Sequence, residues 1–420
     1  MRKGFTMGDA GSPALDLALA PAPSDATAVV RELDEATAGL DAPIGALSVP
    51  ALAANARSLS ERAGRLPIRV ASKSVRVRAV LHAVLALPGF AGVLAYTLRE
   101  ALWLAETVPD VVVGYPSADR GAIARLCASE SLARRVTLMI DDLDQLDLVD
   151  SVVPAGRRGD VRVCLEVDVA LTHRALGRLG VWRSPIATAD DARRLAEAIV
   201  RRRGFRLVGL MAYEAQLAGL GDSPAGRPVR AAVVRSVHRR SREEVADRRA
   251  AAVSAVSAVT PLEFVNGGGT GSLESTSDDP SVTEAAAGSG LFGPHLFDQY
   301  SAFTPLPAAA FALPVVRRPS PRRVVIAGGG WMASGPVGRD REPRVVLPEG
   351  LRPEPREGFG EVQTPLVGAA ADAVAVGDRV WLRHAKAGEL SEHLDRFALV
   401  SEGGVLGHIP TYRGEGKAFL

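Results

Sequence analysis

The stretch "RLPIRVASKSVR", residues 65–76, places a lysine directly after a short apolar run. Ile68, Val70 and Ala71 are typical of a buried strand, and Lys73 follows at its end. Lysine is rarely fully buried without a partner, because moving its charge out of water costs free energy. The amine of Lys73 therefore either has a chemical task at the end of a core strand or extends along the surface to reach water.

Apolar runs of this kind recur along the chain up to about residue 300, and most are separated by stretches with apolar residues at helical spacing. The predicted strands cover residues 68–72, 89–96, 110–116, 136–142, 162–169, 205–213, 262–269 and 284–292. Near-continuous apolar strands that alternate with helices favour a parallel sheet, and eight such units predict a closed (β/α)₈ barrel of the TIM type. An open doubly wound sheet is the competing architecture.

The pattern changes after residue 300. Prolines concentrate in residues 304–323, and short β-like runs joined by glycine and proline turns follow from residue 322 onward. This pattern predicts a mostly-β domain. We therefore expect three parts: an N-terminal lead with a short helix over residues 1–44, a barrel over residues 45–300 and a C-terminal β domain over residues 301–420.

Charge and composition exclude several classes of partner. The 420 residues carry 50 basic and 48 acidic side chains, so we expect no nucleic-acid partner. Arginine-rich stretches at residues 201–206 and 238–250 lie in or beside helical segments and are interpreted as solvated helix faces. The two cysteines, Cys127 and Cys164, are too few for a disulfide framework or a zinc cluster. We find no apolar run of about 18 residues and no convincing signal peptide, so we expect no membrane span and a cytoplasmic location.

The segment "NGGGTGS", residues 266–272, follows the seventh predicted strand. Three consecutive glycines leave backbone amides unshielded, and Thr270 and Ser272 add hydroxyl donors, so the loop suits an anion such as phosphate. Barrels of this type often bind phosphate after their seventh strand. The alternative is a tight turn that requires positive φ.

The lysine and the glycine loop together indicate one kind of ligand. A desolvated lysine has a lowered pKa and a larger neutral fraction, and a neutral amine forms Schiff bases with carbonyl compounds. An aldehyde that carries a phosphate meets both features, and pyridoxal 5′-phosphate is such a molecule.

Several segments resemble the fold-type III pyridoxal phosphate enzymes, the alanine racemase-like barrels, and within them the branch of D-threonine aldolase and D-serine dehydratase. The resemblance extends from about residue 45 to the C-terminus. It rests on the order and spacing of "RVASKSVR" (69–76), "RLGV" (178–181), "GLMAYEAQLAG" (209–219), "NGGGTGS", "EAAAGSGLFGPHLFDQY" (284–300) and "GDRVWLRHAKAGE" (377–389).

This resemblance implies a set of roles. Lys73 carries the cofactor as a Schiff base, Tyr213 lies near the pyridine ring, and Arg178 supports the ring on its O3′ side. The phosphate is held by Gly267, Gly268, Gly269 and Thr270, with Ser289 and Gly290 of the next loop as helpers. The resemblance also implies a homodimer in which the β domain of one chain closes the barrel of the other.

One segment departs from the pattern of the resembled branch. That branch binds a divalent metal ion through His-x-Cys or His-x-Asp, whereas here Lys386 stands two residues after His384. Glu389 is the replacement ligand that we expect, with Glu392 and His393 as alternatives. A divalent metal ion bound by His384 and Glu389 is therefore an open prediction, since a lone histidine is more often structural.

The resemblance predicts a lyase that acts on a β-hydroxy D-amino acid, by retro-aldol cleavage or by deamination through β-elimination. An amino-acid racemase is the alternative and requires a second base, for which Tyr300 and Tyr412 are candidates. A non-catalytic pyridoxal phosphate-binding protein is a further alternative. A sugar-phosphate barrel that uses Lys73 without a cofactor also stays open.

Overall fold

The computed structural model describes residues 15–17, 23, 25–173, 177–386 and 388–420. The chain forms two compact units, each assembled from separate segments. The first, called the barrel unit, comprises Leu59–Lys73, Pro88–Gly288 and Phe419–Leu420. The second, called the sheet unit, comprises Met1–Ser58, Ser74–Leu87 and Ser289–Ala418.

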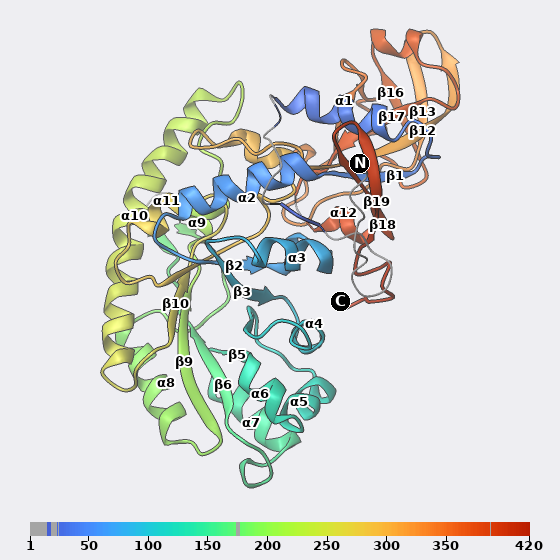
Figure 1. Ribbon diagram of the computed structural model, residues 1–420. Helices are drawn as coiled ribbons and strands as arrows, with labels where there is room; N and C mark the ends of the chain where they lie inside the picture. The colour runs from blue at the N-terminus through green and yellow to red at the C-terminus, as the bar shows by residue number, and fades with distance from the viewer. Residues whose placement is uncertain (1–14, 18–22, 24, 174–176, 387) are drawn as a thin grey trace. The chain divides into compact units, whose positions relative to one another are not determined.

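Parallel strands form the core of the barrel unit. They are β2 (Ile68–Ala71), β3 (Phe90–Ala95), β4 (Val111–Val113), β5 (Val136–Ile140), β6 (Val161–Glu166), β9 (Phe205–Ala212), β10 (Phe264–Gly267) and β11 (Glu284–Ala287). Within the described residues, these eight close into a barrel in the order β10-β11-β2-β3-β4-β5-β6-β9 (Figure 1). They are the eight apolar runs of the sequence, so the predicted closed barrel is confirmed and the open sheet is excluded.

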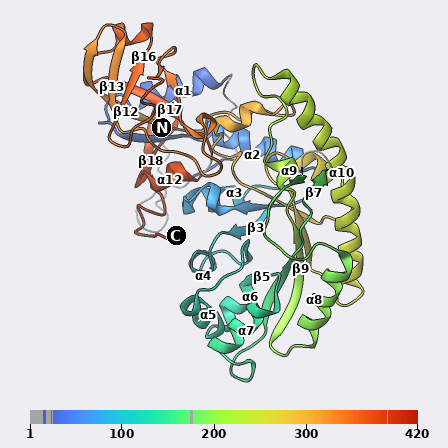
Figure 2. The same ribbon diagram turned by 180° about the vertical axis from the view of Figure 1, so that it is seen from behind.

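Helices cover the outside of the barrel. They are α4 (Leu98–Leu104), α5 (Arg120–Cys127), α6 (Glu130–Arg135), α7 (Leu143–Val152), α8 (Ala189–Arg201), α9 (Ala215–Ala218), α10 (Pro228–Ser257) and α11 (Leu273–Ser277). Several begin at a side chain that accepts a backbone N–H of the first turn, including Thr97, Asp119, Asp142 and Thr188. These caps start the helices shortly after the strands end, so the chain returns along the outside of the barrel. The long helix α10 packs against α8 (Figures 1 and 2).

The barrel interior combines an apolar cluster with a buried ion-pair network. The cluster contains Val112, Met139, Cys164, Val208, Met211 and Phe264. Arg69 donates to Glu284 at 2.7 and 2.8 Å and to Asp110 at 2.8 Å, and the side-chain amide of Asn266 donates to Glu284 at 2.9 Å. We call these four residues the basal network, because Asp110 and Glu284 lie at the beginnings of the strands.

The sheet unit contains a mixed sheet. Its strands are β1 (Ile44–Ser48), β12 (Ala309–Ser320), β13 (Arg323–Ala327), β14 (Arg344–Leu347), β15 (Arg352–Pro353), β16 (Gln363–Val367), β17 (Arg379–Arg383), β18 (Arg396–Ser401) and β19 (Gly404–Pro410). The β1–β18 pair is parallel, and the other pairs are antiparallel. The expected C-terminal strand-rich region is therefore confirmed. Helix α1 (Ala26–Ala36) is the short helix expected in the N-terminal part, and α2 (Val49–Ala63) follows β1.

The sequence pattern missed three strands of this sheet: β1, β12 and the two-residue β15. Residues 44–48 form β1, which pairs with β12 and β18. The proline-rich stretch contains β12, the central strand that pairs with β1, β13 and β17. Its pairing with β13 shifts register twice between Val315 and Ser320, and such irregularities accommodate prolines that cannot donate to a ladder.

In the described part of the chain, no helix combines the length and the apolar character that crossing a membrane demands.

Candidate active site

The chemistry-bearing side chains lie where the barrel strands end. Lys73 follows β2 in a 3₁₀ turn, and residues 268–272 follow β10. Since β11 lies between β2 and β10, and all three strands are parallel, Lys73 and the glycine loop share one rim of the barrel. Neighbouring strands are about 4.8 Å apart, so the two strand ends are separated by about 10 Å. This rim is where barrels of this type carry their active sites.

Lys73 is exposed to solvent and held by a tyrosine. Its Nζ donates a hydrogen bond of 2.6 Å to the hydroxyl of Tyr115, which follows β4. The guanidinium of Arg183 lies 5.5 Å from the centre of the same ring. The interpretation of Lys73 as a desolvated amine is therefore wrong for this structure. The lysine is instead oriented by a hydrogen bond while its amine stays accessible.

A buried carboxyl group lies at the end of β6. Glu166 is 4% exposed, and burial raises the pKa of its carboxyl to about 7, with a smaller contribution in the same direction from Asp141 and an opposing one from Arg183. Burial also raises the pKa of Asp141, which follows β5. The rim thus contains a carboxyl group that changes protonation near neutral pH. Sequence reasoning missed Glu166, although its position at a strand end in "CLEVDV" is a usable signal.

Arg178 forms an ion pair inside the same unit. Its guanidinium pairs with the carboxylate of Asp168 and donates to the carbonyl of Val181 at 3.1 Å. The guanidinium also lies 4.5 Å from the centre of the Trp182 ring. Arg178 belongs to β8 (Gly177–Leu179), which pairs with β7 (Leu171–His173). Its predicted role on the O3′ side of a cofactor stays a prediction.

Tyr213 follows β9 and lies against the glycine loop. Burial raises the pKa of Tyr213 to about 12, with a further contribution from Glu214, so the phenol stays protonated. A Cβ at Gly269 would lie 3.5 Å from the Tyr213 ring and only 2.8 Å from Cβ of Ala218. A glycine is therefore required at position 269, and the surface beside Tyr213 is a cradle that a side chain would fill.

The loop amides are less exposed than the sequence suggested. Gly268 has a φ of +84°, as the tight-turn alternative requires, and its N–H donates to Glu214 at 3.0 Å. The N–H of Gly269 donates to Oγ of Ser272 at 3.2 Å. Among the described residues, the N–H of Gly271 makes no hydrogen bond. The loop amide that is available to a ligand is thus at the tip, at Gly271, rather than at Gly268.

A buried network lies beneath this loop. Glu214 accepts hydrogen bonds from Gly268, Ser272 and Thr276, and Arg249 of α10 pairs with both Glu214 and Asp279. Arg249 is 1% exposed, so the interpretation of residues 238–250 as a solvated face is wrong at this position. We call Glu214, Arg249 and Asp279 the loop network. The carboxylate next to Tyr213 in "MAYEAQ" was the only sequence signal for it.

The remaining predicted site residues belong to the sheet unit. Ser289 and Gly290 come directly after the last barrel segment, and Gly290 is buried. His384 is 4% exposed, and burial lowers its pKa to about 3. Oε1 of Glu389 accepts the N–H of Ser334 at 2.9 Å.

These residues do not fit a metal site. Both ring nitrogens of His384 and Oε2 of Glu389 are buried and lack a hydrogen-bond partner among the described residues. Missing partners alone do not indicate a metal ion, because two separate buried groups can each lack a partner. Across residues 25–173, 177–386 and 388–420, three or more His, Cys, Asp or Glu side chains are nowhere grouped to hold an ion. The structure therefore does not support the predicted metal ion at His384 and Glu389.

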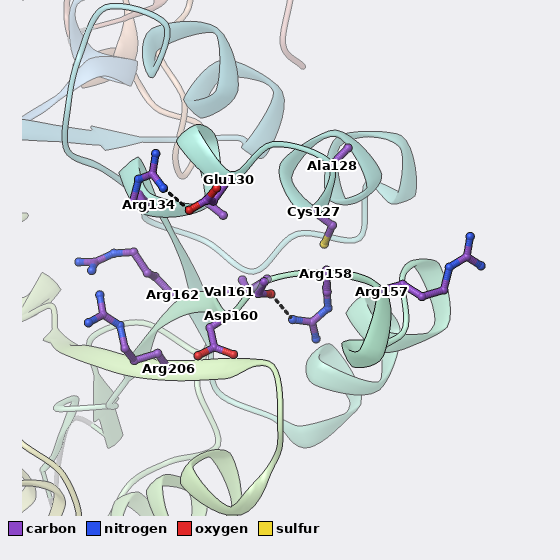
Figure 3. A pocket seen from close by; sticks show the side chains of 12 residues that line it. Cys127, Ala128, Glu130, Arg134, Arg157, Arg158, Asp160, Val161, Arg162 and Arg206 are labelled. Atoms are coloured by element: carbon purple, nitrogen blue, oxygen red, sulfur yellow. Dashed lines mark hydrogen bonds and ion pairs between the residues drawn. The ribbon is translucent and has the colours of Figure 1, made fainter.

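A separate cavity of about 740 Å³ lies where β6 begins (Figure 3). It is lined by Cys127, Ala128, Glu130, Ala133, Arg134, Arg157, Arg158, Gly159, Asp160, Val161, Arg162 and Arg206. Arg162 and Arg206 share Glu263, Arg134 pairs with Glu130, and Arg158 pairs with Asp150. Because its cations are largely neutralised and Val161 starts β6 whereas Glu166 ends it, this cavity is not the candidate active site.

An eight-stranded parallel barrel joined to a strand-rich unit, with a lysine after its first strand, is the architecture of the fold-type III pyridoxal phosphate enzymes. The chain belongs to the family described as alanine racemase, N-terminal domain, whose model matches residues 47–295. The resemblance inferred from the sequence is thereby confirmed. A comparison with curated proteins finds no match.

Solved structures with the same fold include relatives with different activities. D-threonine aldolase from Filomicrobium marinum is 20% identical, with a TM-score of 0.73 over 91% of this chain and 97% of that one. D-threo-3-hydroxyaspartate dehydratase from Delftia sp. HT23 is 20% identical, with a TM-score of 0.63 over 88% and 97%. Alanine racemase from Clostridium difficile 630 is 11% identical, with a TM-score of 0.58 over 88% and 98%. At these identities the comparison establishes the fold.

Proposed function

We propose that the chain is a pyridoxal phosphate-dependent lyase that acts on a β-hydroxy D-amino acid by retro-aldol cleavage or by β-elimination. One observation carries this proposal: an accessible lysine, oriented by Tyr115, shares the rim of the barrel with a glycine cradle beside Tyr213. The aldolase and dehydratase among the structural neighbours support the reaction class.

The residues on the rim fit the cofactor. Lys73 would hold its aldehyde carbon, Tyr213 would lie beside its ring, and the loop from Gly267 to Thr270, extended to Gly271, would receive its phosphate. The proposal also keeps the predicted roles of three further residues. Arg178 would lie on the O3′ side of the ring, and Ser289 and Gly290 would assist at the phosphate. When bound, pyridoxal phosphate supplies an electron sink for the bonds at Cα of an amino acid.

The side chains at this rim of the barrel suit the proton transfers of both lyase reactions. Lys73 and the Tyr115 hydroxyl, joined at 2.6 Å, form a pair that can hold a proton beside Cα. Glu166, with a pKa raised to about 7, can take a proton from a β-hydroxyl in retro-aldol cleavage or give one to it in β-elimination. Arg183, exposed beside Tyr115, suits the α-carboxylate of the substrate. No step is assigned to a metal ion.

A panel of D- and L-amino acids tests the proposal. The purified protein, loaded with pyridoxal phosphate, is incubated with each isomer, with and without chelator, and assayed for aldehyde, ammonia and inversion. We expect aldehyde or ammonia from β-hydroxy D-isomers and no product from Lys73→Ala. Inversion of both isomers would establish the racemase alternative, and cofactor binding without turnover would establish a carrier. Activity on L-isomers alone contradicts the proposal.

The proposed assembly is a cytoplasmic homodimer with a small-molecule amino-acid substrate. The family resemblance supports the dimer, in which the β domain of one chain closes the barrel of the other. Light scattering of the purified protein measures the mass directly, and a monomer at working concentrations contradicts this part of the proposal.

A further inference from the structure

One carboxylate, that of Glu214, accepts hydrogen bonds from both ends of the glycine loop. Glu214 accepts the N–H of Gly268 at 3.0 Å on one side of the loop, and the hydroxyls of Ser272 at 3.2 Å and Thr276 at 2.6 Å on the other. Ser272 in turn accepts the N–H of Gly269. Glu214 therefore fixes both ends of the segment from Gly269 to Gly271, while Arg62 donates to the carbonyl of Thr270 at 2.7 Å in its middle.

Glu214 is itself held in place by an arginine. Its side chain is 1% exposed, and such a carboxylate is stable only when it is paired and hydrogen-bonded. Arg249 donates to Glu214 at 2.7 Å, to the carbonyl of Ala212 at 2.9 Å and to Asp279 at 2.7 Å. Asp279 also accepts the N–H and hydroxyl of Ser281. These contacts tie the position of Glu214 to the end of β9 through Ala212 and to the segment between α11 and β11 through Asp279.

The cations beneath the loop are paired with carboxylates. Arg249 pairs with Glu214 and Asp279, and Arg62 pairs with Glu274, which also lies near Arg242. A phosphate bound here would therefore meet cations that are already engaged with carboxylates. Its affinity would depend on donors held in the right orientation.

We propose that Glu214 is a positioning residue: it sets the glycine loop in the conformation that recognises the cofactor phosphate, and Arg249 and Asp279 hold Glu214 in place. This inference rests on the proposed function, because it concerns the same cofactor. The inference predicts the direction in which phosphate affinity changes when Glu214 is replaced, and this direction distinguishes a positioning role from an electrostatic one. Glu214→Gln removes a negative charge near the phosphate, so an electrostatic role predicts tighter phosphate binding, whereas a positioning role predicts weaker binding.

The test compares pyridoxal 5′-phosphate with pyridoxal, which lacks the phosphate. Both are titrated by absorbance into the wild-type protein, Glu214→Gln and the control Glu284→Gln, which alters the buried carboxylate of the basal network instead. The measured quantity is the ratio of the two dissociation constants, pyridoxal over pyridoxal 5′-phosphate. We expect a large ratio for wild type and the control, and a ratio lower by about tenfold or more for Glu214→Gln, since one lost charged hydrogen bond corresponds to such a factor.

Each outcome has a defined meaning. A wild-type protein that binds both compounds equally overturns the proposed function. A wild-type preference that Glu214→Gln retains or increases overturns the positioning role and leaves the proposed function intact. If Glu214→Gln does not fold, Thr276→Val removes one donor to Glu214 with little change of shape. A ratio lowered several-fold by Thr276→Val supports the inference, and an unchanged ratio overturns it.

Discussion

The barrel contains two buried arginine–carboxylate networks that use the same chemistry for different ends. In the basal network, Arg69 joins Glu284 and Asp110, and the remaining partner of Glu284 is Asn266 on the adjacent strand. In the loop network, Arg249 joins Glu214 and Asp279, and the other partners of Glu214 lie in the glycine loop and at α11. One network therefore connects strands, and the other connects the strands to a loop.

The difference shows how a buried ion pair acquires a role beyond stability. A paired carboxylate can accept several hydrogen bonds, and the arginine occupies only part of that capacity. Where the remaining acceptor positions face neighbouring strands, the network supports the barrel alone. Where they face a glycine loop, the same desolvated carboxylate fixes the loop against the rest of the rim.

The largest effect is expected from removing the arginine of each network. Arg249→Met leaves Glu214 and Asp279, both at most 3% exposed, without their cation, and breaking such a pair costs about 3–5 kcal/mol. Arg69→Met should cost less, because the side chain of Asp110 is 47% exposed and can be hydrated. Urea denaturation of both variants measures the free energy of unfolding. Equal losses, or a larger loss for Arg69→Met, would contradict the comparison.

Glu166 extends the comparison to a buried carboxyl that, among the described residues, forms no ion pair with an arginine. Its pKa is about 7 in the folded protein and 4.5 when unperturbed, so between these values the folded state retains a proton that the unfolded state releases. Stability must therefore fall as pH rises from 4.5 to 7 and level off above pH 7, by on the order of 3 kcal/mol. Glu166→Gln should remove most of this fall and be more stable than wild type at pH 8.

Urea denaturation from pH 5 to pH 8 measures this dependence. Burial also raises the pKa of Asp141, so any slope that Asp141 contributes in Glu166→Gln has the same sign. Glu214→Gln is the matched variant from the loop network and should leave the slope from Glu166 in place. If wild type and Glu166→Gln lose stability in parallel over this range, the assignment to Glu166 is wrong.

The parts of the molecule that the sequence predicted are those encoded locally. The barrel strands are near-continuous apolar runs separated by helices, so each could be located from its own residues. Lys73 and the glycine loop were found because each lies directly after such a run. Strand β12 was missed because its prolines mimic a linker, although Pro314 pairs with β17 in regular register and Pro319 lies at a register shift against β13.

The loop network could not be found in this way. Its members lie on three separate segments, and Arg249 comes from a helix rich in exposed charge, where nothing local distinguishes a buried arginine from a solvated one. Only the packing of α10 against the barrel reveals which arginine turns inward. The accessibility of Lys73 and the raised pKa of Glu166 likewise depend on neighbours that are distant in sequence.

The smallest effect on stability is expected for the exposed hydrogen bond between Lys73 and Tyr115, which involves no buried charge. Tyr115→Phe keeps the ring beside Arg183 and removes only the hydroxyl that accepts from Lys73. An exposed hydrogen bond contributes little to folding, so the free energy of unfolding should change by less than about 0.5 kcal/mol. The rate at which pyridoxal phosphate is captured, followed by stopped-flow absorbance, should fall by about tenfold because the amine loses its fixed orientation. A variant that captures the cofactor at the wild-type rate would show that Tyr115 does not position Lys73, whereas a large loss of stability would place Tyr115 with the two buried networks.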